Sequence, residues 1–266
     1  MSQTEPSLAG KAALVTGSTS GIGLAIARAL ATEGCHVMLN GFGDPAEIEH
    51  LRAGLAHLHG NRVGHSPADM TRPADILTMV EQAEDELGGL DIVVNNAGIQ
   101  HVAPIASFPA EQWERVIAIN LSAPFYVTQA AIPALRRAGG GRIINIASVH
   151  GLVASRDKAA YVAAKHGLVG LTKAASLELV DDAITVNAIC PGWVLTPLVR
   201  AQLDSRAERE GLPVAEVTHA FLAEKQPMAQ FSTPDSIAAM AIFLCGPAAA
   251  TITGAALPID GGWTAR

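Results

Sequence analysis

Short, β-rich apolar runs alternate with longer segments of helical spacing along nearly the whole chain. The runs lie at residues 12–15, 36–39, 91–94, 142–146, 185–189 and 256–259, with a weaker one near 62–65. Strands that alternate with helices form βαβ units, and right-handed crossovers place the helices on both faces of a parallel sheet. The sequence therefore predicts an α/β fold, built on a single doubly wound, Rossmann-type parallel sheet of about seven strands.

The composition narrows the class of protein further. Of 266 residues, 49% are hydrophobic and 16% are charged, which supplies enough apolar surface for a sizeable core. No linker-like stretch interrupts the pattern, so we expect one domain over residues 1–266. A net charge of -7 without a Lys/Arg cluster argues against a nucleic-acid partner. No apolar run reaches the ~20 residues that span a bilayer, and the polar start lacks signal-peptide features, so we expect a cytoplasmic protein with no membrane partner. Three widely separated cysteines predict reduced thiols and no metal site.

The first strand runs directly into the loop TGSTSGIG, residues 16–23, and then into an apolar-periodic helix. Gly17, Gly21 and Gly23 allow a tight turn, close approach to a pyrophosphate and packing of the helix on the strand. The glycines alone also fit a plain strand-to-helix turn, but the flanking strand and helix are the context that a dinucleotide site needs. We count Thr19 and Ile22 of this loop among the expected cofactor contacts.

The residues around the end of the second strand favour NAD over NADP. A ribose 2′-phosphate requires a nearby Arg or Lys, and neither TGSTSGIG nor LNGFGD, residues 39–44, contains one. The Asp or Glu that usually holds the ribose is replaced by Asn40 and Gly41, so we expect Asn40 or a backbone group to bind it. Phe42 either lies against the adenine or packs as an ordinary surface aromatic.

Polar residues that follow later strands form a second set of candidates. NNAG, residues 95–98, ends the fourth strand, and IASVHG, residues 146–151, ends the fifth. Tyr161 and Lys165 are spaced by one helical turn and share one face of the next helix. Each feature alone occurs often, and Ser148 alone fits a helix cap. Together with Asn120 and the glycine loop, they predict an active site at the carboxyl edge of the sheet.

These motifs carry a resemblance to a known family. TGSTSGIG, NNAG, Asn120, Ser148, Tyr161, Lys165, Pro191 and Gly192 resemble the short-chain dehydrogenase/reductase family from end to end. The segments LNGFGD, NNAGIQH, VAAKHG, ICPGWV and DGGWTAR are similar to those of its 3-hydroxybutyrate-oxidising branch. The resemblance implies that Ser148 holds the substrate oxygen, Tyr161 exchanges the proton and Lys165 binds the nicotinamide ribose. It implies that Asn120 anchors a water, and it assigns to NAD the residues Asp69, Asn96, Gly98, Tyr161, Lys165, Val194 and Thr196.

Residue chemistry supports an acid/base role for Tyr161. A free phenol has a pKa of about 10, and we expect the nearby Lys165 ammonium to lower the pKa of Tyr161 by favouring the phenolate. Tyr161 then accepts the hydroxyl proton during alcohol oxidation and returns it during reduction, while Ser148 stabilises the developing oxyanion.

Several further residues are candidates for binding the substrate. Four polar ones are Gln100, His150, Lys158 and Gln202, and each alone also fits an exposed polar side chain. One ammonium, one imidazole and two amides suit a small carboxylate, and the resemblance assigns them that task. Trp193 and Trp263 follow glycine-containing turns. Core packing is the commoner role of tryptophan, whereas the resemblance implies that both wall off the short alkyl end of the substrate.

The resemblance also bears on the lid, the assembly and the reaction. Residues 196–225 are either a solvated helix pair or, as in the family, a substrate lid that excludes water. Family members commonly form homotetramers through the helices expected here near 124–137 and 159–180.

The implied reaction is NAD-dependent interconversion of D-3-hydroxybutyrate and acetoacetate. One alternative is an NADPH-dependent 3-oxoacyl thioester reductase, although no phosphate-binding basic residue or cationic surface is visible. The other is a non-catalytic NAD-binding sensor, which is disfavoured because the catalytic tetrad of Asn120, Ser148, Tyr161 and Lys165 is intact.

Overall fold

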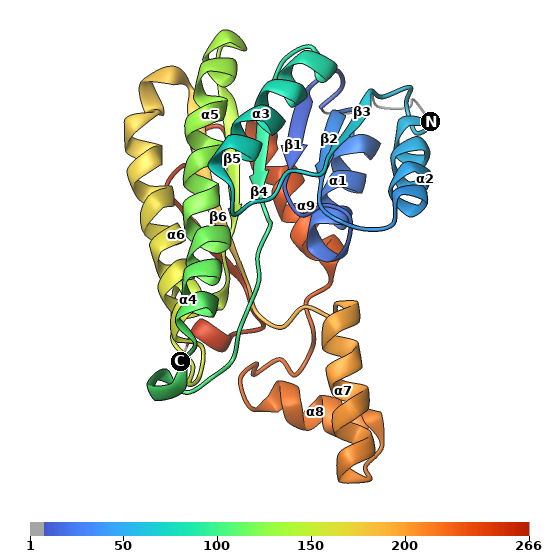
Figure 1. Cartoon of the computed structure of the whole chain (residues 1–266), viewed down its shortest axis with the longest axis vertical. Coiled ribbons are helices and arrows are strands. Elements are labelled where there is room, and N and C mark those ends of the chain that lie inside the picture. The colour runs from blue at the N-terminus through green and yellow to red at the C-terminus, as the bar shows by residue number, and fades with distance from the viewer. Residues whose placement is uncertain (1–7, 266) are drawn as a thin grey trace.

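Seven parallel strands form one twisted sheet at the centre of the molecule (Figure 1). The computed structural model describes residues 8–265, apart from the side chains of Pro197, Leu198 and Gln202. The strands are β1 (Ala12–Val15), β2 (His36–Asn40), β3 (Val63–Ser66), β4 (Ile92–Asn95), β5 (Gly141–Ile146), β6 (Ile184–Pro191) and β7 (Ala256–Ile259). Their order is β3-β2-β1-β4-β5-β6-β7. The predicted doubly wound fold is confirmed, and each expected strand lies within two residues of its predicted bounds.

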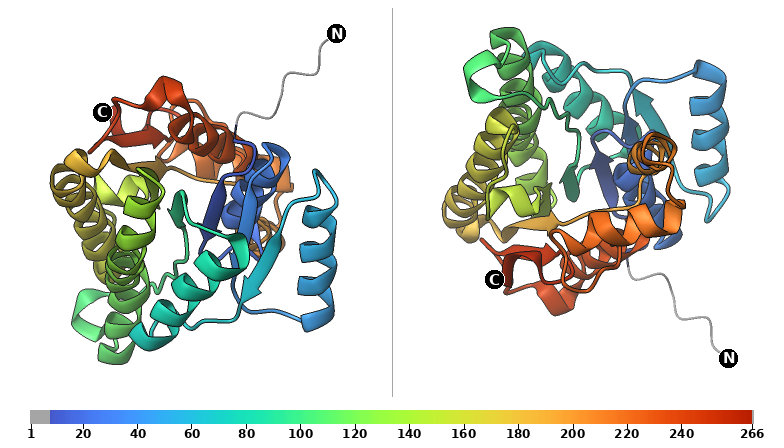
Figure 2. Two further views of the ribbon diagram at one scale, coloured as in Figure 1. Left: turned by 90° about the horizontal axis from the view of Figure 1, so that it is seen from above. Right: turned by 90° about the horizontal axis from the view of Figure 1, so that it is seen from below.

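Helices cover both faces of the sheet (Figure 2). They are α1 (Gly21–Thr32), α2 (Pro45–Ala56), α3 (Pro73–Leu87), α4 (Ala110–Ile117), α5 (Ala123–Arg137), α6 (Ala159–Glu178), α7 (Pro197–Glu210), α8 (Val214–Ala223) and α9 (Pro234–Cys245). Helices α1 and α9 pack together on one face, and α3 and α5 pack on the other. Strand order reverses between β1 and β4, so the loops that follow these strands diverge and open a crevice at the carboxyl edge.

The core follows from the two-residue repeat of the buried strands. In β1, Ala13 and Val15 face the α1–α9 layer, whereas Ala12 and Leu14 face the α3–α5 layer. All four side chains are buried, and burial of a side chain the size of Leu14 contributes about 1.5–3 kcal/mol. Both faces therefore need apolar residues, which explains why the strands read as continuous apolar runs.

One helical stretch, Ala110–Arg137, is long and apolar enough to cross a membrane by length and composition. It joins α4 and α5 through a π-helical segment, Ala118–Ser122. Within α5, Val127, Ala131 and Leu135 are buried in the core beside α3, which accounts for much of the apolar composition. Core helices pass the same test, so the stretch is weak evidence for a membrane span.

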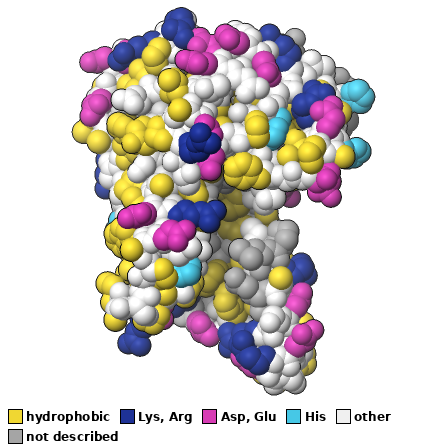
Figure 3. Space-filling model, in the orientation of Figure 1, with side chains coloured by type: hydrophobic (Ala, Val, Ile, Leu, Met, Phe, Trp, Pro, Cys, Tyr) yellow, Lys and Arg dark blue, Asp and Glu magenta, His cyan; other side chains and the backbone are white. Residues whose placement is uncertain are grey.

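Helices α7 and α8 project from the sheet body, and the surface is hollowed where they leave it (Figures 1 and 3). Leu203, Ala207 and Val217 form a small apolar cluster between the two helices, and Leu195 and Phe221 pack against it. The two helices lie within the segment 196–225.

Substitution of Gly23 tests the packing of α1 on the glycine loop. A Cβ at this position would lie 2.3 Å from the carbonyl oxygen of Gly17 and 2.4 Å from Nδ2 of Asn96. We expect Gly23→Ala to lower the free energy of unfolding by about 2–3 kcal/mol, because the loop must shift. Gly54→Ala is the matched control: Gly54 lies within α2 with open space around its Cβ position, so this change should stabilise by about 0.5–1 kcal/mol. Equal denaturation midpoints for the two variants would contradict the packing argument.

Candidate active site

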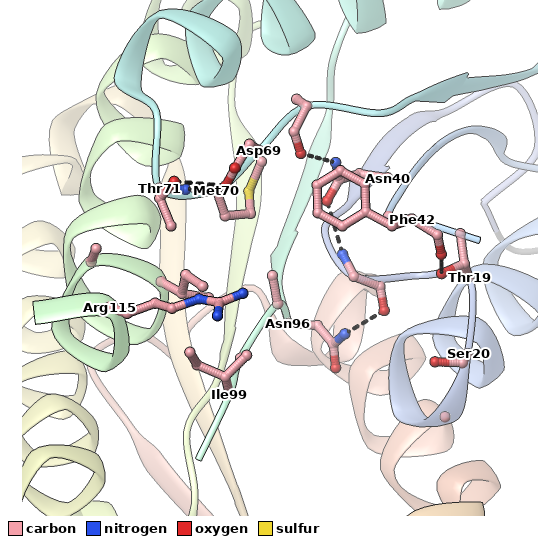
Figure 4. Close-up of a pocket in the computed structure, with 18 of the residues that line it drawn as sticks. Thr19, Ser20, Asn40, Phe42, Asp69, Met70, Thr71, Asn96, Ile99 and Arg115 are labelled. Carbon is pink, nitrogen blue, oxygen red and sulfur yellow. Dashed lines mark hydrogen bonds between the residues drawn. The ribbon is translucent and has the colours of Figure 1, made fainter. Parts of the chain in front are cut away.

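A cleft of about 1130 Å³ opens at the carboxyl edge of the sheet, beyond the ends of β1 and β4 (Figure 4). Its walls come from the glycine loop, the loop after β2, the segment after β3 and helix α4. Nine of the thirteen predicted cofactor residues line it: Gly17, Thr19, Gly21, Ile22, Phe42, Asp69, Asn96, Gly98 and Thr196. Gly23 packs behind the loop, and Val194 is 6% exposed in the segment after β6.

The glycine loop is held in shape by its neighbours. Gly17 and Gly21 adopt positive φ values of 61° and 58°, which favour glycine. Asn96 donates from Nδ2 to the carbonyls of Thr16 and Gly17 at 2.9 and 3.0 Å, and Thr16 Oγ1 accepts from two backbone N–H groups after β4. The loop is thereby fixed with the N-terminus of α1 facing the cleft, where the helix dipole favours an anion. These features fit the pyrophosphate of a dinucleotide.

Of the two groups expected at the ribose, Asn40 or a backbone group, the Asn40 side chain already binds other parts of the protein. Asn40 is 1% exposed, and its Nδ2 donates to the carbonyls of Ser66 and Ala68 at 3.1 Å each. Its Oδ1 accepts a hydrogen bond from the N–H of Gly17 at 3.1 Å. The amide therefore joins three loops inside the protein and has no free donor for a ribose. The alternative, a backbone group after β2, is consistent with Gly41, which lines the cleft.

Other walls of the cleft combine predicted and unpredicted residues. Phe42 is 68% exposed at its rim, and the Oγ1 of Thr19 donates to the Phe42 carbonyl at 3.1 Å. Asp69 accepts hydrogen bonds from the N–H and hydroxyl of Thr71, which hold the pKa of its carboxyl below the usual range. Arg115 reaches into the cleft from α4 on the opposite side (Figure 4). It was not predicted, because no motif marks it and only the packing of α4 brings it to the cleft.

Three of the predicted catalytic residues meet where β5 ends and α6 begins. Ser148 is 8% exposed and caps a short turn, accepting the N–H of His150 at 3.1 Å. Tyr161 and Lys165 lie on the first turns of α6, with the Lys165 Nζ 5.6 Å from the centre of the Tyr161 ring. That Nζ donates to the carbonyl of Ile146 at 2.8 Å, and Lys165 is 3% exposed. The predicted cluster of Ser148, Tyr161 and Lys165 is therefore present in the fold.

Burial sets the protonation of this cluster and corrects one expectation. Burial raises the pKa of the Tyr161 phenol, and a hydrogen bond with Ser148 opposes this shift only in part. The expectation that Lys165 lowers the pKa of Tyr161 is therefore wrong for the cofactor-free protein. Burial also lowers the pKa of Lys165 to about 8, because an ammonium loses its hydration inside the protein. Burial therefore sets the direction of the pKa shift in both groups.

Asn120 lies in the π-helical segment between α4 and α5 and is fully buried. Its Nδ2 donates to the carbonyls of Ile99 and Val116, both at 2.9 Å. Within the part of the chain that the structure describes, its Oδ1 has no hydrogen-bond partner. The extra residue of a π turn aims this side chain at the loop after β4.

An aromatic enclosure adjoins Tyr161. The His150 ring stands edge-on to Tyr161 at 6.0 Å and to Trp263 at 5.5 Å between ring centres. The Trp193 ring lies 5.6 Å from Trp263 and 4.4 Å from Phe221 of α8. The structure thus brings together both predicted tryptophans, and it adds Phe221, which pattern analysis missed because nothing in its local sequence marks it.

Positive charge gathers at this enclosure. The Nζ of Lys158 lies 5.2 Å from the centre of the Trp193 ring. Burial and the nearby Lys225 ammonium lower the pKa of Lys158, and burial with the Lys158 charge lowers the pKa of His150 to about 4. His150 is therefore a neutral imidazole at pH 7, and an anion placed beside Lys158 would relieve the repulsion from Lys225.

The structure says less about the two glutamines that were predicted to bind the substrate. Gln100 is exposed in the loop after β4. Gln202 belongs to α7, and its side chain lies outside the described part of the structure.

Comparisons with known proteins agree with this geometry. A family model described as enoyl-(acyl carrier protein) reductase matches residues 17–264. The D-beta-hydroxybutyrate dehydrogenase of Cupriavidus necator is 54% identical over 261 residues, which cover 97% of this chain and 100% of that protein. A protein of the same name from Rhizobium meliloti is 52% identical over 256 residues, covering 96% and 99%. The structure of L-sorbose reductase from Gluconobacter frateurii, complexed with NADPH and L-sorbose, has a TM-score of 0.94 at 30% identity and covers 99% and 100%.

The internal role of Asn40 predicts the effect of Asn40→Asp. A carboxylate cannot donate to the carbonyls of Ser66 and Ala68, so we expect the variant to lose about 2–4 kcal/mol of unfolding free energy at pH 7. The loss should shrink as the pH falls, because a protonated carboxyl can donate one of these bonds. Denaturant titrations at pH 5 and pH 7 measure this. Unchanged stability with tighter cofactor binding would instead place the side chain at the ribose.

The lowered pKa of Lys165 predicts how stability depends on pH. Between about pH 8 and the usual lysine pKa of 10.5, the unfolded chain binds more protons, so the free energy of unfolding should rise with pH. At pH 7 the shift is equivalent to about 3 kcal/mol, and loss of the bond to Ile146 offsets about 1 kcal/mol of it. Lys165→Met should therefore stabilise the cofactor-free protein by about 2 kcal/mol at pH 7 and remove this rise.

The matched control is Lys173→Met, which changes an exposed lysine of the same helix and should alter neither the stability nor its dependence on pH. A destabilised Lys165→Met protein at pH 7 would contradict the burial argument.

Proposed function

Because the chain belongs to the short-chain dehydrogenase/reductase family, we propose that it is an oxidoreductase that uses NAD to interconvert D-3-hydroxybutyrate and acetoacetate. The observation that carries the substrate class is the Lys158 ammonium at a small aromatic enclosure directly beside Tyr161. An ammonium selects a carboxylate, and tryptophan walls suit a short alkyl chain. The relatives named for this reaction match over nearly the whole chain, which supports the same conclusion.

In this proposal the reaction depends on proton transfer at Tyr161. When bound, the oxidised nicotinamide supplies the two-electron acceptor. Ser148 and the Tyr161 phenol hold the substrate oxygen by hydrogen bonds, and Tyr161 exchanges its proton with that oxygen. Because burial raises the pKa of Tyr161, the phenol is ready to act as an acid during reduction. Oxidation needs the phenolate, so its rate should rise with pH in the neutral to alkaline range.

The other groups around Tyr161 bind the cofactor, a water and the substrate. Lys165, held by the carbonyl of Ile146, stands where it can bind the nicotinamide ribose and, when charged, favour the Tyr161 phenolate. The free Oδ1 of Asn120 can anchor a water that links the site to solvent. Neutral His150 packs between Tyr161 and Trp263 and can share in binding the substrate carboxylate without adding charge.

We assign NAD rather than NADP as the cofactor because no Arg or Lys follows β2 in the stretch 39–44. Arg115 is a cation that could instead bind the 2′-phosphate of NADP, since it enters the same cleft from α4. Measuring the rate with NAD and NADP at equal concentration, in the native protein and in Arg115→Ala, decides the assignment.

The proposal also covers the lid, the oligomeric state and the location of the enzyme in the cell. Helices α7 and α8 would close over bound ligand and exclude water, with residues 196–225 acting as one lid. The half-exposed aromatic side chains of Trp113 and Phe125, on α4 and α5, suit the helix pairing of a homotetramer. We place the enzyme in the cytoplasm, acting on a small carboxylate substrate.

The direct test supplies NAD with each enantiomer of 3-hydroxybutyrate and follows NADH absorbance. NADH formation with the D enantiomer alone is expected. The rival expected from the sequence is reduction of a 3-oxoacyl thioester, and the family model's description names enoyl reduction, so 3-oxoacyl and 2-enoyl thioesters with NADH and NADPH form the second arm. Faster turnover of thioesters than of acetoacetate would replace the proposed function.

Tyr161→Phe removes the acid/base group and leaves the ring. We expect turnover to fall by ~10² to 10⁴-fold, with NADH binding followed by fluorescence changed less than about twofold. Turnover close to that of the native enzyme would exclude Tyr161 from the mechanism.

Lys158→Ala removes the ammonium that faces the enclosure. The KM for 3-hydroxybutyrate should rise by about 10 to 100-fold while the KM for NAD stays within about twofold, because a charge-assisted hydrogen bond is lost only from the acid. An equal rise in both constants would argue against capture of the carboxylate by Lys158.

A further inference from the structure

A buried glutamine joins the lid to the wall of the substrate enclosure. Gln226 follows α8, where the chain returns from the projecting helices to the body, and its side chain is 0% exposed. Its Oε1 accepts a hydrogen bond from the backbone N–H of Trp193, and its Nε2 donates to the carbonyl of Gln230 at 2.7 Å. Both ends of the amide are therefore satisfied by backbone groups of two different segments.

Two glycines show how tightly this amide is enclosed. A Cβ on Gly192 would lie 2.7 Å from the Gln226 Oε1 and 2.9 Å from the Cα of Asp260. A Cβ on Gly261, where φ is 58°, would lie 3.0 Å from the Nε2. The segments that follow β6, α8 and β7 thus converge on one side chain, and the two glycines permit the close approach.

Trp193 carries the effect of this contact to the enclosure. Its ring touches Phe221 and Trp263, and the Lys158 ammonium lies over it. Its carbonyl accepts the N–H of Ser232 at 3.0 Å, so its backbone is fixed from both sides. A shift of the Trp193 backbone would move both the apolar wall and the position of the ammonium.

We propose that Gln226 is a positioning residue that sets the width of the substrate enclosure by fixing Trp193 against the base of α8. The amide does not touch the substrate in this arrangement and acts only through Trp193. The limit on substrate length follows: with Trp193 fixed, a short 3-hydroxy acid fits and a longer alkyl chain does not. The identity of the acid rests on the proposed function, whereas the placement of Trp193 does not.

The first test compares Gln226→Met with Gln230→Met. Methionine matches the length of glutamine but makes neither hydrogen bond, whereas the exposed Gln230 contributes only its backbone carbonyl. For Gln226→Met we expect the kcat/KM preference for 3-hydroxybutyrate over 3-hydroxyhexanoate to fall about tenfold, mostly through KM, with NADH binding within about twofold. Gln230→Met should match the native enzyme. An unchanged preference in Gln226→Met would overturn the proposal.

Gln226→Glu should make KM depend on pH, which a purely structural role would not do. This variant also tests the proposal if Gln226→Met does not fold. A protonated carboxyl can still accept from Trp193 and donate to Gln230, but an ionised one cannot donate. The charged groups nearby are the Asp260 carboxylate after β7, Lys225 on the same segment, and Lys158 over the Trp193 ring. The ratio of variant to native KM for 3-hydroxybutyrate should be close to one at pH 6. By pH 9 it should rise part of the way to the Gln226→Met value, because the ionised carboxylate still accepts from Trp193 and loses only the bond to Gln230. A ratio independent of pH would contradict the proposed role of the donor bond.

Tryptophan fluorescence tests the placement without any substrate. The emission maximum should differ between native protein and Gln226→Met, and this difference should vanish when both carry Trp193→Phe. No difference in emission would overturn the proposal. If the native protein fails to oxidise 3-hydroxybutyrate and the Trp193-dependent difference is present, the proposed function fails and the positioning role stands.

Discussion

The hydrogen bond from the Lys165 ammonium to the carbonyl of Ile146, inside the protein, is the contact on which the active site depends. It fixes the start of α6 to the end of β5, which carries Ser148 and Tyr161 into one place. Gly151 allows this approach, since a Cβ there would lie 2.8 Å from the Lys165 carbonyl oxygen. The contact buries a cation, and this burial lowers the pKa of Lys165 and costs the folded protein stability.

The two halves of the site are built by different means. The cofactor cleft relies on backbone geometry, with glycines at positive φ and the amides of Asn40 and Asn96 holding the loops from behind. The substrate side relies on side chains contributed by distant segments, in which Trp193, Trp263 and Phe221 meet around Lys158. This division lets the side chains of the enclosure change without disturbing the sheet or the glycine loop.

Most of the fold was predictable from sequence because both faces of the sheet are covered, so most strands read as apolar runs; the edge strand β3, VGHS, gave the weakest signal. The glycine loop, Ser148, Tyr161 and Lys165 were predictable because short motifs place them at strand ends. The choice at the ribose between Asn40 and a backbone group stayed open because the position of Asn40 in the motif does not show which way its amide turns. Arg115, Phe221 and Gln226 were missed because only tertiary packing brings them to the site. The direction of the Tyr161 pKa shift was missed for a related reason: spacing reveals a nearby charge but not the burial that outweighs it.

The central claim is that burial keeps the Tyr161 phenol protonated in the cofactor-free protein despite the neighbouring lysine. The chain has only two tyrosines, so tyrosinate absorbance near 295 nm, recorded as native protein minus Tyr161→Phe across pH 6 to 12, isolates this one group. The account predicts that the difference signal appears only above about pH 10, the usual range of a phenol. A transition centred below pH 9 would contradict it and would show that the charge of Lys165 dominates over burial.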